Sequence, residues 1–154
     1  MFKEAVNGFR VADRIRKRPD AAVFSNGSES CDPKTRKRTV LVVDDEKRIA
    51  DTLCEILRMY DFEAVAAYDG WDALDTITRF RPDYLLTDVL MPRMNGVELA
   101  IAVHNSCPAA KILLFSGQAG ISGILESGKE RGFNFPVVAK PIHPLKLLQQ
   151  LKEL

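Results

Sequence analysis

The stretch TVLVVDDE, residues 39–46, decides the fold. Its first five residues, Thr39–Val43, are β-branched or apolar, which predicts a short strand buried on both faces. Strands of this kind are typical of parallel sheets that are covered by helices. The strand runs directly into three acids, Asp44, Asp45 and Glu46. We therefore expect an α/β sheet with carboxylates at the end of one strand.

Strand and helix patterns alternate strictly along residues 39–154. The further predicted strands are Glu63–Ala67, Tyr84–Thr87, Lys111–Phe115 and Pro136–Ala139. Apolar residues at spacings of three and four predict a helix after each strand. The second is expected over Gly70–Phe80, the fourth over Ile121–Arg131 and the last over Pro144–Leu154, with Leu145, Leu148, Leu151 and Leu154 on one face. This alternation predicts a doubly wound, five-stranded parallel sheet.

The composition is that of one ordinary globular domain. The chain has 154 residues, of which 46% are hydrophobic and 28% charged, so a disordered chain, a collagen and a disulfide scaffold are excluded. Its three cysteines are widely spaced, which argues against a zinc site and favours a reducing compartment. Neither a membrane span of about 20 apolar residues nor a signal peptide is present. We expect a cytoplasmic protein.

Residues 1–38 form a basic N-terminal extension that stands outside the alternation. They hold ten Lys or Arg and five Asp or Glu, a net charge of +5, whereas residues 39–154 carry a net −4. One face of a short predicted helix would carry Phe2, Val6, Phe9, Ala12 and Ile15, and Ser25–Arg38 is typical of a linker. Three interpretations of this extension stay open. It could be a solvated tail, or a product of a start codon assigned too far upstream. It could also contact a partner protein, an anionic membrane or a nucleic acid.

Polar residues follow four of the predicted strands. They are Asp44 and Asp45 after the first strand, Asp88 after the third, Ser116 after the fourth and Lys140 after the fifth. Ligands of such sheets bind outside the carboxyl ends of the strands. Clustered carboxylates oppose one another's ionisation, and Mg²⁺ relieves that conflict; a lysine and a hydroxyl can hold an anion. The set therefore predicts a site for phosphorylating an aspartate, although single acids at strand ends are often only solvated or helix caps.

Four motifs in this order carry a resemblance to a known family. They are VLVVDDE (Val40–Glu46), DYLLTDVLMPRMNG (Asp83–Gly96), LLFSG (Leu113–Gly117) and VVAKPI (Val137–Ile142). Together they make residues 39–154 similar to the receiver domain of bacterial two-component response regulators. The resemblance implies a flavodoxin-like (βα)5 fold.

The resemblance also implies a role for each site residue. Asp88 would accept the phosphoryl group, Lys140 would contact it, and Ser116 would be the switch hydroxyl that moves inward. Asp45, Asp88 and the Leu90 backbone carbonyl would bind Mg²⁺, with Asp44 in the same acidic pocket, bound through water. The Lys140–Pro141 bond is expected to be cis.

Some positions depart from the family pattern or invite a different interpretation. Val137 replaces the usual aromatic switch residue, so coupling through a rotating ring is in doubt. Leu90 and Gln118 would flank the attacking water, and we hypothesise that apolar Leu90 lengthens the phosphoryl lifetime. His143 is interpreted as a surface residue that starts the last helix, and Trp71 as a packing residue.

The predicted function is a phosphorylation-dependent switch rather than an enzyme. A histidine kinase or a phosphotransfer protein would supply the phosphoryl group, and an unknown downstream protein would receive the signal. We expect a stand-alone receiver without a DNA-binding domain, because 38 residues are too few for one; phosphorylation-dependent homodimerisation stays open. One alternative is an interaction module without phosphorylation. A hydrolase with an aspartate nucleophile is disfavoured, since Leu90 stands where an acid is expected.

Overall fold

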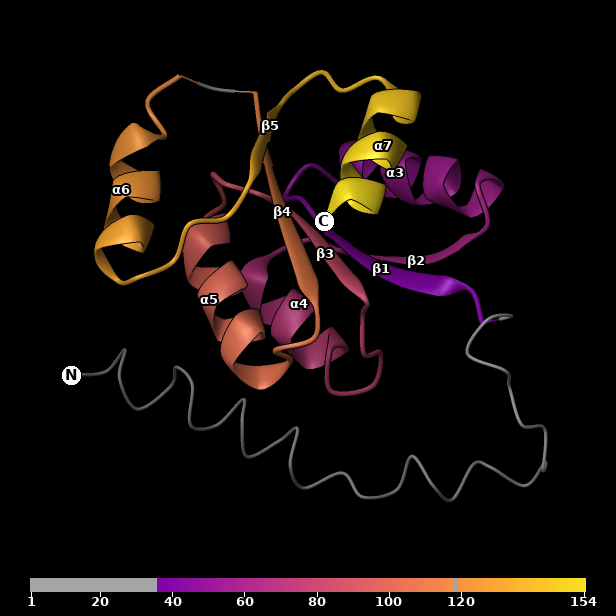
Figure 1. The fold of residues 1–154 in the computed structure, drawn as a ribbon, viewed down its shortest axis with the longest axis horizontal. Helices are drawn as coiled ribbons and strands as arrows, with labels where there is room; N and C mark the ends of the chain where they lie inside the picture. The colour runs from indigo at the N-terminus through magenta and orange to yellow at the C-terminus, as the bar shows by residue number, and fades with distance from the viewer. Residues whose placement is uncertain (1–35, 118) are drawn as a thin grey trace.

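The computed structural model describes residues 36–117 and 119–154. Most of the predicted basic extension, including its helix, and Gln118 lie outside these residues. Five parallel strands form one sheet in the order β2-β1-β3-β4-β5 (Figure 1). The strands are β1 (Arg38–Val43), β2 (Phe62–Ala67), β3 (Tyr84–Asp88), β4 (Lys111–Ser116) and β5 (Val137–Ala139). The predicted doubly wound sheet is confirmed.

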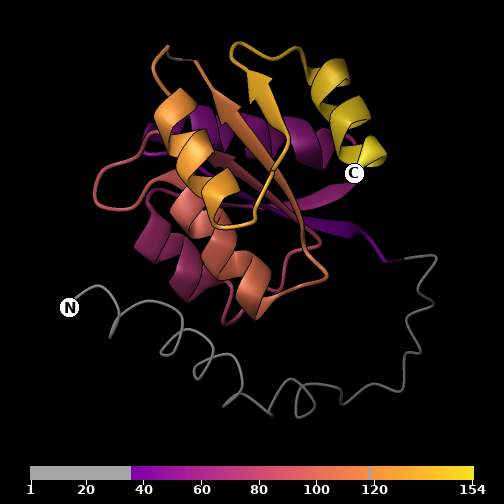
Figure 2. The same cartoon turned by 60° about the vertical axis from the view of Figure 1, so that its left-hand side comes forward.

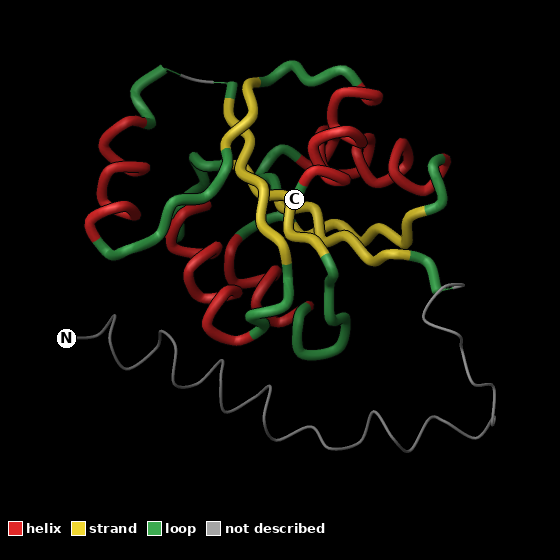
Figure 3. The backbone as a smooth tube through the Cα atoms, in the orientation of Figure 1, coloured by secondary structure: helices red, strands yellow, loops and turns green. Residues whose placement is uncertain are grey.

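Helices cover both faces of this sheet. They are α3 (Lys47–Met59), α4 (Gly70–Thr76), α5 (Gly96–Ser106), α6 (Ser122–Glu130) and α7 (Pro144–Glu153). Figures 1 and 2 show α3 and α7 together on one side and α4, α5 and α6 on the other. The tube in Figure 3 shows the strands between these two helical layers. None of the helices in the described part of the chain is long and apolar enough to cross a membrane.

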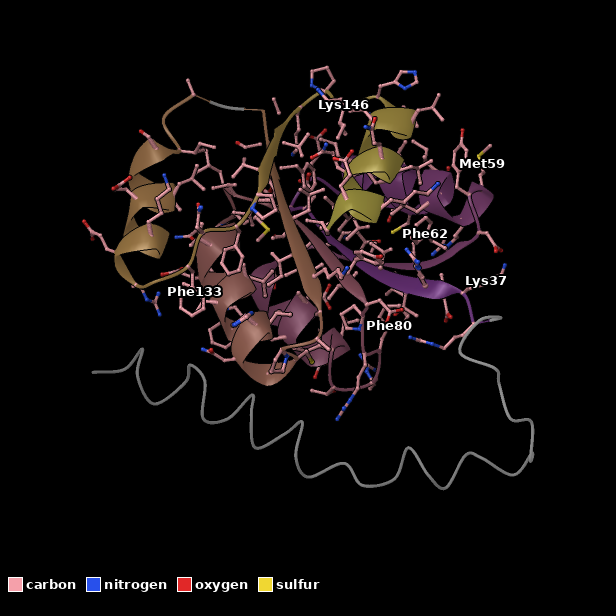
Figure 4. All side chains as sticks on the ribbon, viewed as in Figure 1. Lys37, Met59, Phe62, Phe80, Phe133 and Lys146 are labelled. Atoms are coloured by element: carbon pink, nitrogen blue, oxygen red, sulfur yellow. The ribbon has the colours of Figure 1, made fainter. Side chains whose placement is uncertain are left out.

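The alternating side chains of the strands supply two cores. On the α3 and α7 side, Val40, Val42 and Leu86 pack against buried helical residues such as Leu57 and Leu151. On the opposite side the strand residues that share the core are Leu41, Val43, Leu85, Ile112 and Leu114. Phe62 and Phe133, labelled in Figure 4, lie on these opposite sides. Both faces of the central strands β1, β3 and β4 are therefore buried, as their apolar sequence predicts.

Two details of the helices differ from the prediction. Leu145, predicted to share one face of the last helix with Leu148 and Leu151, is 59% exposed, whereas those two residues are buried. The buried residues of α7 are Leu147, Leu148 and Leu151, and Leu145 lies in the exposed first turn. Helix α4 ends at Thr76 rather than continuing to Phe80, and hydrogen-bonded turns complete the segment.

The amino ends of β1 and β3 are tied together by Asp83. One of its carboxylate oxygens accepts hydrogen bonds from the Thr39 N–H (2.9 Å) and hydroxyl (3.0 Å), and the other pairs with Arg36 at 2.7 Å. Lys37 pairs with Asp61 at 3.1 Å, and Arg38 donates to the Tyr84 hydroxyl. Residues 36–38, predicted as the end of a linker, thus hold the chain to the sheet, and β1 begins at Arg38.

Candidate functional site

The first acid of the site, Asp44, follows β1 directly and is almost completely buried. Its N–H donates to the Ala67 carbonyl at 3.2 Å, which extends the pairing of β1 with β2 by one step. One carboxylate oxygen accepts the Glu46 N–H at 2.9 Å, in the turn that leads into α3. The other oxygen lies 2.7 Å from the Lys140 ammonium. Both carboxylate oxygens of Asp44 are therefore occupied, one by the turn into α3 and the other by Lys140, which follows β5.

Asp88 is the last residue of β3, beside Phe115 of β4. Its side chain lies 3.4 Å from the Lys140 ammonium, at the edge where β1 also ends. Burial raises the pKa of the Asp88 carboxyl, and the neighbouring Asp44 carboxylate raises it further. Lys140 and a hydrogen bond from the Leu90 N–H offset only part of this rise. The surroundings of Asp88 thus disfavour the charged form of its carboxyl group.

Lys140 reaches this edge from the end of β5. Its N–H donates to the Ser116 carbonyl at 2.9 Å, and its ammonium lies 4.4 Å from the centre of the Phe115 ring. A Cβ on Gly117 would lie 3.2 Å from the Lys140 Cβ, so the absence of a side chain at Gly117 leaves room for the lysine. The Lys140–Pro141 bond is cis, as expected. In this position the Lys140 ammonium pairs with both Asp44 and Asp88.

Asp45 completes the acidic cluster. Asp44, Asp45 and Asp88 each offer a carboxylate oxygen within 4.8 Å of the other two, and Asp45 is exposed to solvent. Three carboxylates and one ammonium leave a formal charge of −2. A hard divalent cation with oxygen ligands matches both this charge and this donor set, so the residues fit Mg²⁺. The proposed contribution of the Leu90 carbonyl stays a prediction.

Ser116, the last residue of β4, is 7% exposed and lies at the same edge of the sheet. Val137 pairs with Leu114 at the start of β5, away from the acids, and is exposed. Beside it, Phe133 and Phe135 stack at 5.8 Å and line a cavity of about 130 Å³ that Val137 also lines. The aromatic rings near this position thus come from the connection before β5 rather than from residue 137.

The structure brings Asp44, Asp45, Asp88 and Lys140 together and places Ser116 at the end of β4, at the same edge of the sheet. It also adds three contacts. The Lys140 ammonium lies over the Phe115 ring, and the Leu90 N–H donates to the Asp88 carboxylate. Gly96 begins α5 so close to β3 that a Cβ there would lie 2.0 Å from the Asp88 carbonyl oxygen. Gly96 ends the quoted motif Asp83–Gly96, but its contact, like the other two, depends on tertiary packing that sequence patterns do not reveal.

The comparisons with known proteins agree with this geometry. The family model of the response regulator receiver domain matches residues 40–152. Chemotaxis protein CheY4 of Vibrio cholerae is 28% identical with a TM-score of 0.68, over 77% of this chain and 98% of that one. A CheY-like receiver domain protein of Methanospirillum hungatei is 26% identical (TM-score 0.69, 77% and 93% covered). A two-component transcriptional regulator AraC of Clostridium phytofermentans is 31% identical (TM-score 0.63, 76% and 90% covered). The chain therefore belongs to the response regulator receiver domain family.

Proposed function

We propose that the protein is a phosphorylation-dependent switch and that Asp88 accepts the phosphoryl group. The observation that carries the proposal is the sharing of Lys140 between Asp44, at 2.7 Å, and Asp88, at 3.4 Å, within a cluster of three aspartates. A purely structural ion pair needs no third carboxylate and no excess of negative charge. A divalent cation, in contrast, needs several carboxylate ligands, and it neutralises their excess negative charge.

The proposed reaction transfers a phosphoryl group from a phosphohistidine. A carboxylate oxygen of Asp88 attacks phosphorus, a P–O bond forms, and the P–N bond breaks with its electron pair passing to the leaving imidazole. Asp45, Asp88, the Leu90 carbonyl and, through water, Asp44 would hold Mg²⁺, which neutralises charge on the transferred group. Lys140 contacts the phosphoryl oxygens as a point charge. The domain assists this transfer and the later hydrolysis of its own aspartyl phosphate, in which water attacks phosphorus and inorganic phosphate leaves, and it turns over no external metabolite.

Phosphorylation would then change the surface that partners contact. A phosphoryl group on Asp88 adds negative charge, to which Lys140 and the Ser116 hydroxyl respond, and the packing around Val137 and α6 shifts with them. Helix α6 is suited to such a shift, because Gly128 is its only buried residue. The partners we propose are a histidine kinase or a histidine phosphotransfer protein upstream and a protein contact downstream, with the switch acting in the cytoplasm.

The direct test is phosphorylation by acetyl phosphate with Mg²⁺, followed by intact mass spectrometry. We expect one phosphoryl adduct on the wild type and none on Asp88→Asn. Asp83→Asn is the matched control, because Asp83 precedes the same strand at its other end, and it should be modified like the wild type. A wild type that stays unmodified and binds no beryllofluoride would instead indicate an interaction module without phosphorylation.

The phosphoryl lifetime tests the proposed role of Leu90. A leucine side chain cannot hydrogen-bond an attacking water, whereas an asparagine can orient one. Leu90→Asn should therefore lose its phosphoryl group faster than the wild type, and Leu90→Met, which is also apolar, should match the wild type. Equal decay of Leu90→Asn and the wild type would contradict this role.

A further inference from the structure

The connection from β3 to α5, residues 89–95, carries Leu90 past the acidic cluster. Its first residue is anchored to the sheet, because the Val89 N–H donates to the Phe115 carbonyl of β4 at 3.2 Å. Its two ends are joined to each other, because the Gly96 N–H donates to the Val89 carbonyl at 2.8 Å. The middle of the connection is a tight turn in which the Met94 N–H donates to the Pro92 carbonyl at 2.7 Å. The position of this turn depends on what holds it from outside.

Arg93 is the central residue of that turn and has a φ of 68°. This left-handed conformation favours glycine and is unfavourable for a residue with a long side chain. Such a residue persists only where its surroundings over-determine the conformation. The backbone at Arg93 therefore requires contacts that keep it in place.

Two contacts with the connection from β2 to α4 meet this need. The Arg93 guanidinium pairs with the Asp69 carboxylate at 2.8 Å. The next residue, Met94, is buried directly against Gly70, where a Cβ would lie 2.6 Å from the Met94 sulfur. The turn is thus fastened at two adjacent points to the residues that begin α4.

Asp69 is itself held before Arg93 reaches it. Its other carboxylate oxygen accepts the Asp72 N–H at 2.8 Å and caps α4. An acid that is already fixed loses little side-chain freedom on forming the ion pair. The two connections also follow β2 and β3, which flank β1, the strand that leads into Asp44 and Asp45. The Arg93–Asp69 pair therefore links the two strand ends on either side of the acidic cluster.

We propose that the Arg93–Asp69 ion pair positions the Leu90 backbone beside the acidic cluster and thereby strengthens cation binding there. The inference rests on the proposed function, because it needs a cation site at Asp44, Asp45 and Asp88. Arg93 and Asp69 are positioning residues: they act through the connection and contact neither the cation nor the phosphoryl group. Because the two residues have opposite charges, the direction in which each substitution changes the Mg²⁺ affinity distinguishes positioning from a long-range charge effect.

The test is calorimetric titration of Mg²⁺ into the wild type, Arg93→Gly and Asp69→Asn. Glycine suits the left-handed turn and asparagine can still cap α4, so neither variant should unfold at lower denaturant concentration. If the pair positions Leu90, both variants bind Mg²⁺ about threefold more weakly, the scale of one exposed ion pair. If only long-range charge matters, loss of the arginine strengthens cation binding and loss of the aspartate weakens it.

Two further variants complete the design. Arg93→Lys keeps a cation and should recover part of the affinity. Arg79→Ala breaks the exposed Arg79–Asp75 pair next to α4 and should bind Mg²⁺ like the wild type. Affinities equal to the wild type, or opposite changes in Arg93→Gly and Asp69→Asn, overturn the positioning role while the proposed function stands. A wild type that binds no Mg²⁺ overturns both.

Discussion

Asp83 and Asp88 stand at opposite ends of β3, and their surroundings treat their charges in opposite ways. Burial raises the pKa of Asp83, but hydrogen bonds from the Thr39 N–H, Arg36 and the Thr39 hydroxyl outweigh it and hold this pKa below its ordinary value. At Asp88, burial and the Asp44 carboxylate raise the pKa, and Lys140 compensates only in part. One strand thus carries a stabilised carboxylate at its start and a destabilised one at its end.

The opposite pKa directions distinguish an acid that joins two strands, Asp83, from one whose charge its surroundings disfavour, Asp88. Asp83 has enough donors to hold its charge without any added group, and its contacts join β1 to β3. Asp88 shares the Lys140 ammonium with a second acid, Asp44, and a bound cation would supply further positive charge there. Four predictions test this contrast between the amino and the carboxyl edges of the sheet.

The largest expected effect is stabilisation by Mg²⁺ at the carboxyl edge. A cation that binds only the folded protein raises the free energy of unfolding by about 2.7 kcal/mol at 100 times its Kd. Urea unfolding with Mg²⁺ and with EDTA measures this difference. It should be present in the wild type and in Asp83→Asn and lost in Asp45→Asn. An equal Mg²⁺ effect in Asp45→Asn would show that the cation binds elsewhere.

The second effect is destabilisation at the amino edge. Asp83→Asn should lower the free energy of unfolding by about 2 kcal/mol at pH 7, because hydrogen bonds to a charged group are lost. Since the folded-state pKa is depressed, the contribution of Asp83 is present above its unfolded-state pKa and is lost as the pH falls below about 4. Urea titrations of both proteins at pH 7 and in acid should therefore converge in acid. A constant difference would contradict the charge-based explanation.

The third effect has the opposite sign. Without metal, Asp88→Asn should raise the free energy of unfolding by about 1 kcal/mol at neutral pH, because it removes one of two crowded carboxylates. A raised folded-state pKa makes the Asp88 charge unfavourable above that pKa and harmless below the unfolded-state value near 3.8. The gain should thus vanish in acid when unfolding is followed in EDTA. A loss of stability at neutral pH would mean that Lys140 already neutralises the cluster.

The smallest effect concerns the exposed pair of Lys37 and Asp61, also at the amino edge. Its side chains are 59% and 81% exposed, and such pairs contribute at most a few tenths of a kcal/mol. Lys37→Ala, at the position labelled in Figure 4, should unfold at the same urea concentration as the wild type. A clear loss would indicate that residue 37 anchors the start of β1 by more than its charge.

The carboxyl edge could be predicted from the sequence because each of its residues directly ends or follows a strand. Val40–Val43 reveals a buried strand, and Asp44 and Asp45 come next, so the position of these acids follows from the strand itself. The same holds for Asp88 and Lys140. The resemblance to receiver domains added their roles, which no spacing rule supplies.

The amino edge and the connections could not be predicted in this way. The bonds of Asp83 to Thr39 join residues 44 positions apart, and they exist only in the register of β1 against β3. The Arg93–Asp69 pair likewise depends on how two connections pack. The exposure of Leu145 could not be predicted, because the spacing of leucines along a helix does not show which of its turns pack against the core.

The close approach of α5 to β3 has a consequence for how this sequence can diverge. Any side chain at position 96 would collide with the backbone carbonyl of Asp88, whereas a Cβ at Gly123 would meet nothing within 4 Å. A library of all substitutions at both glycines, selected for signalling, should keep glycine alone at 96 and accept many residues at 123. The two glycines, Gly96 and Gly123, thus differ strongly in the range of residues that can replace them.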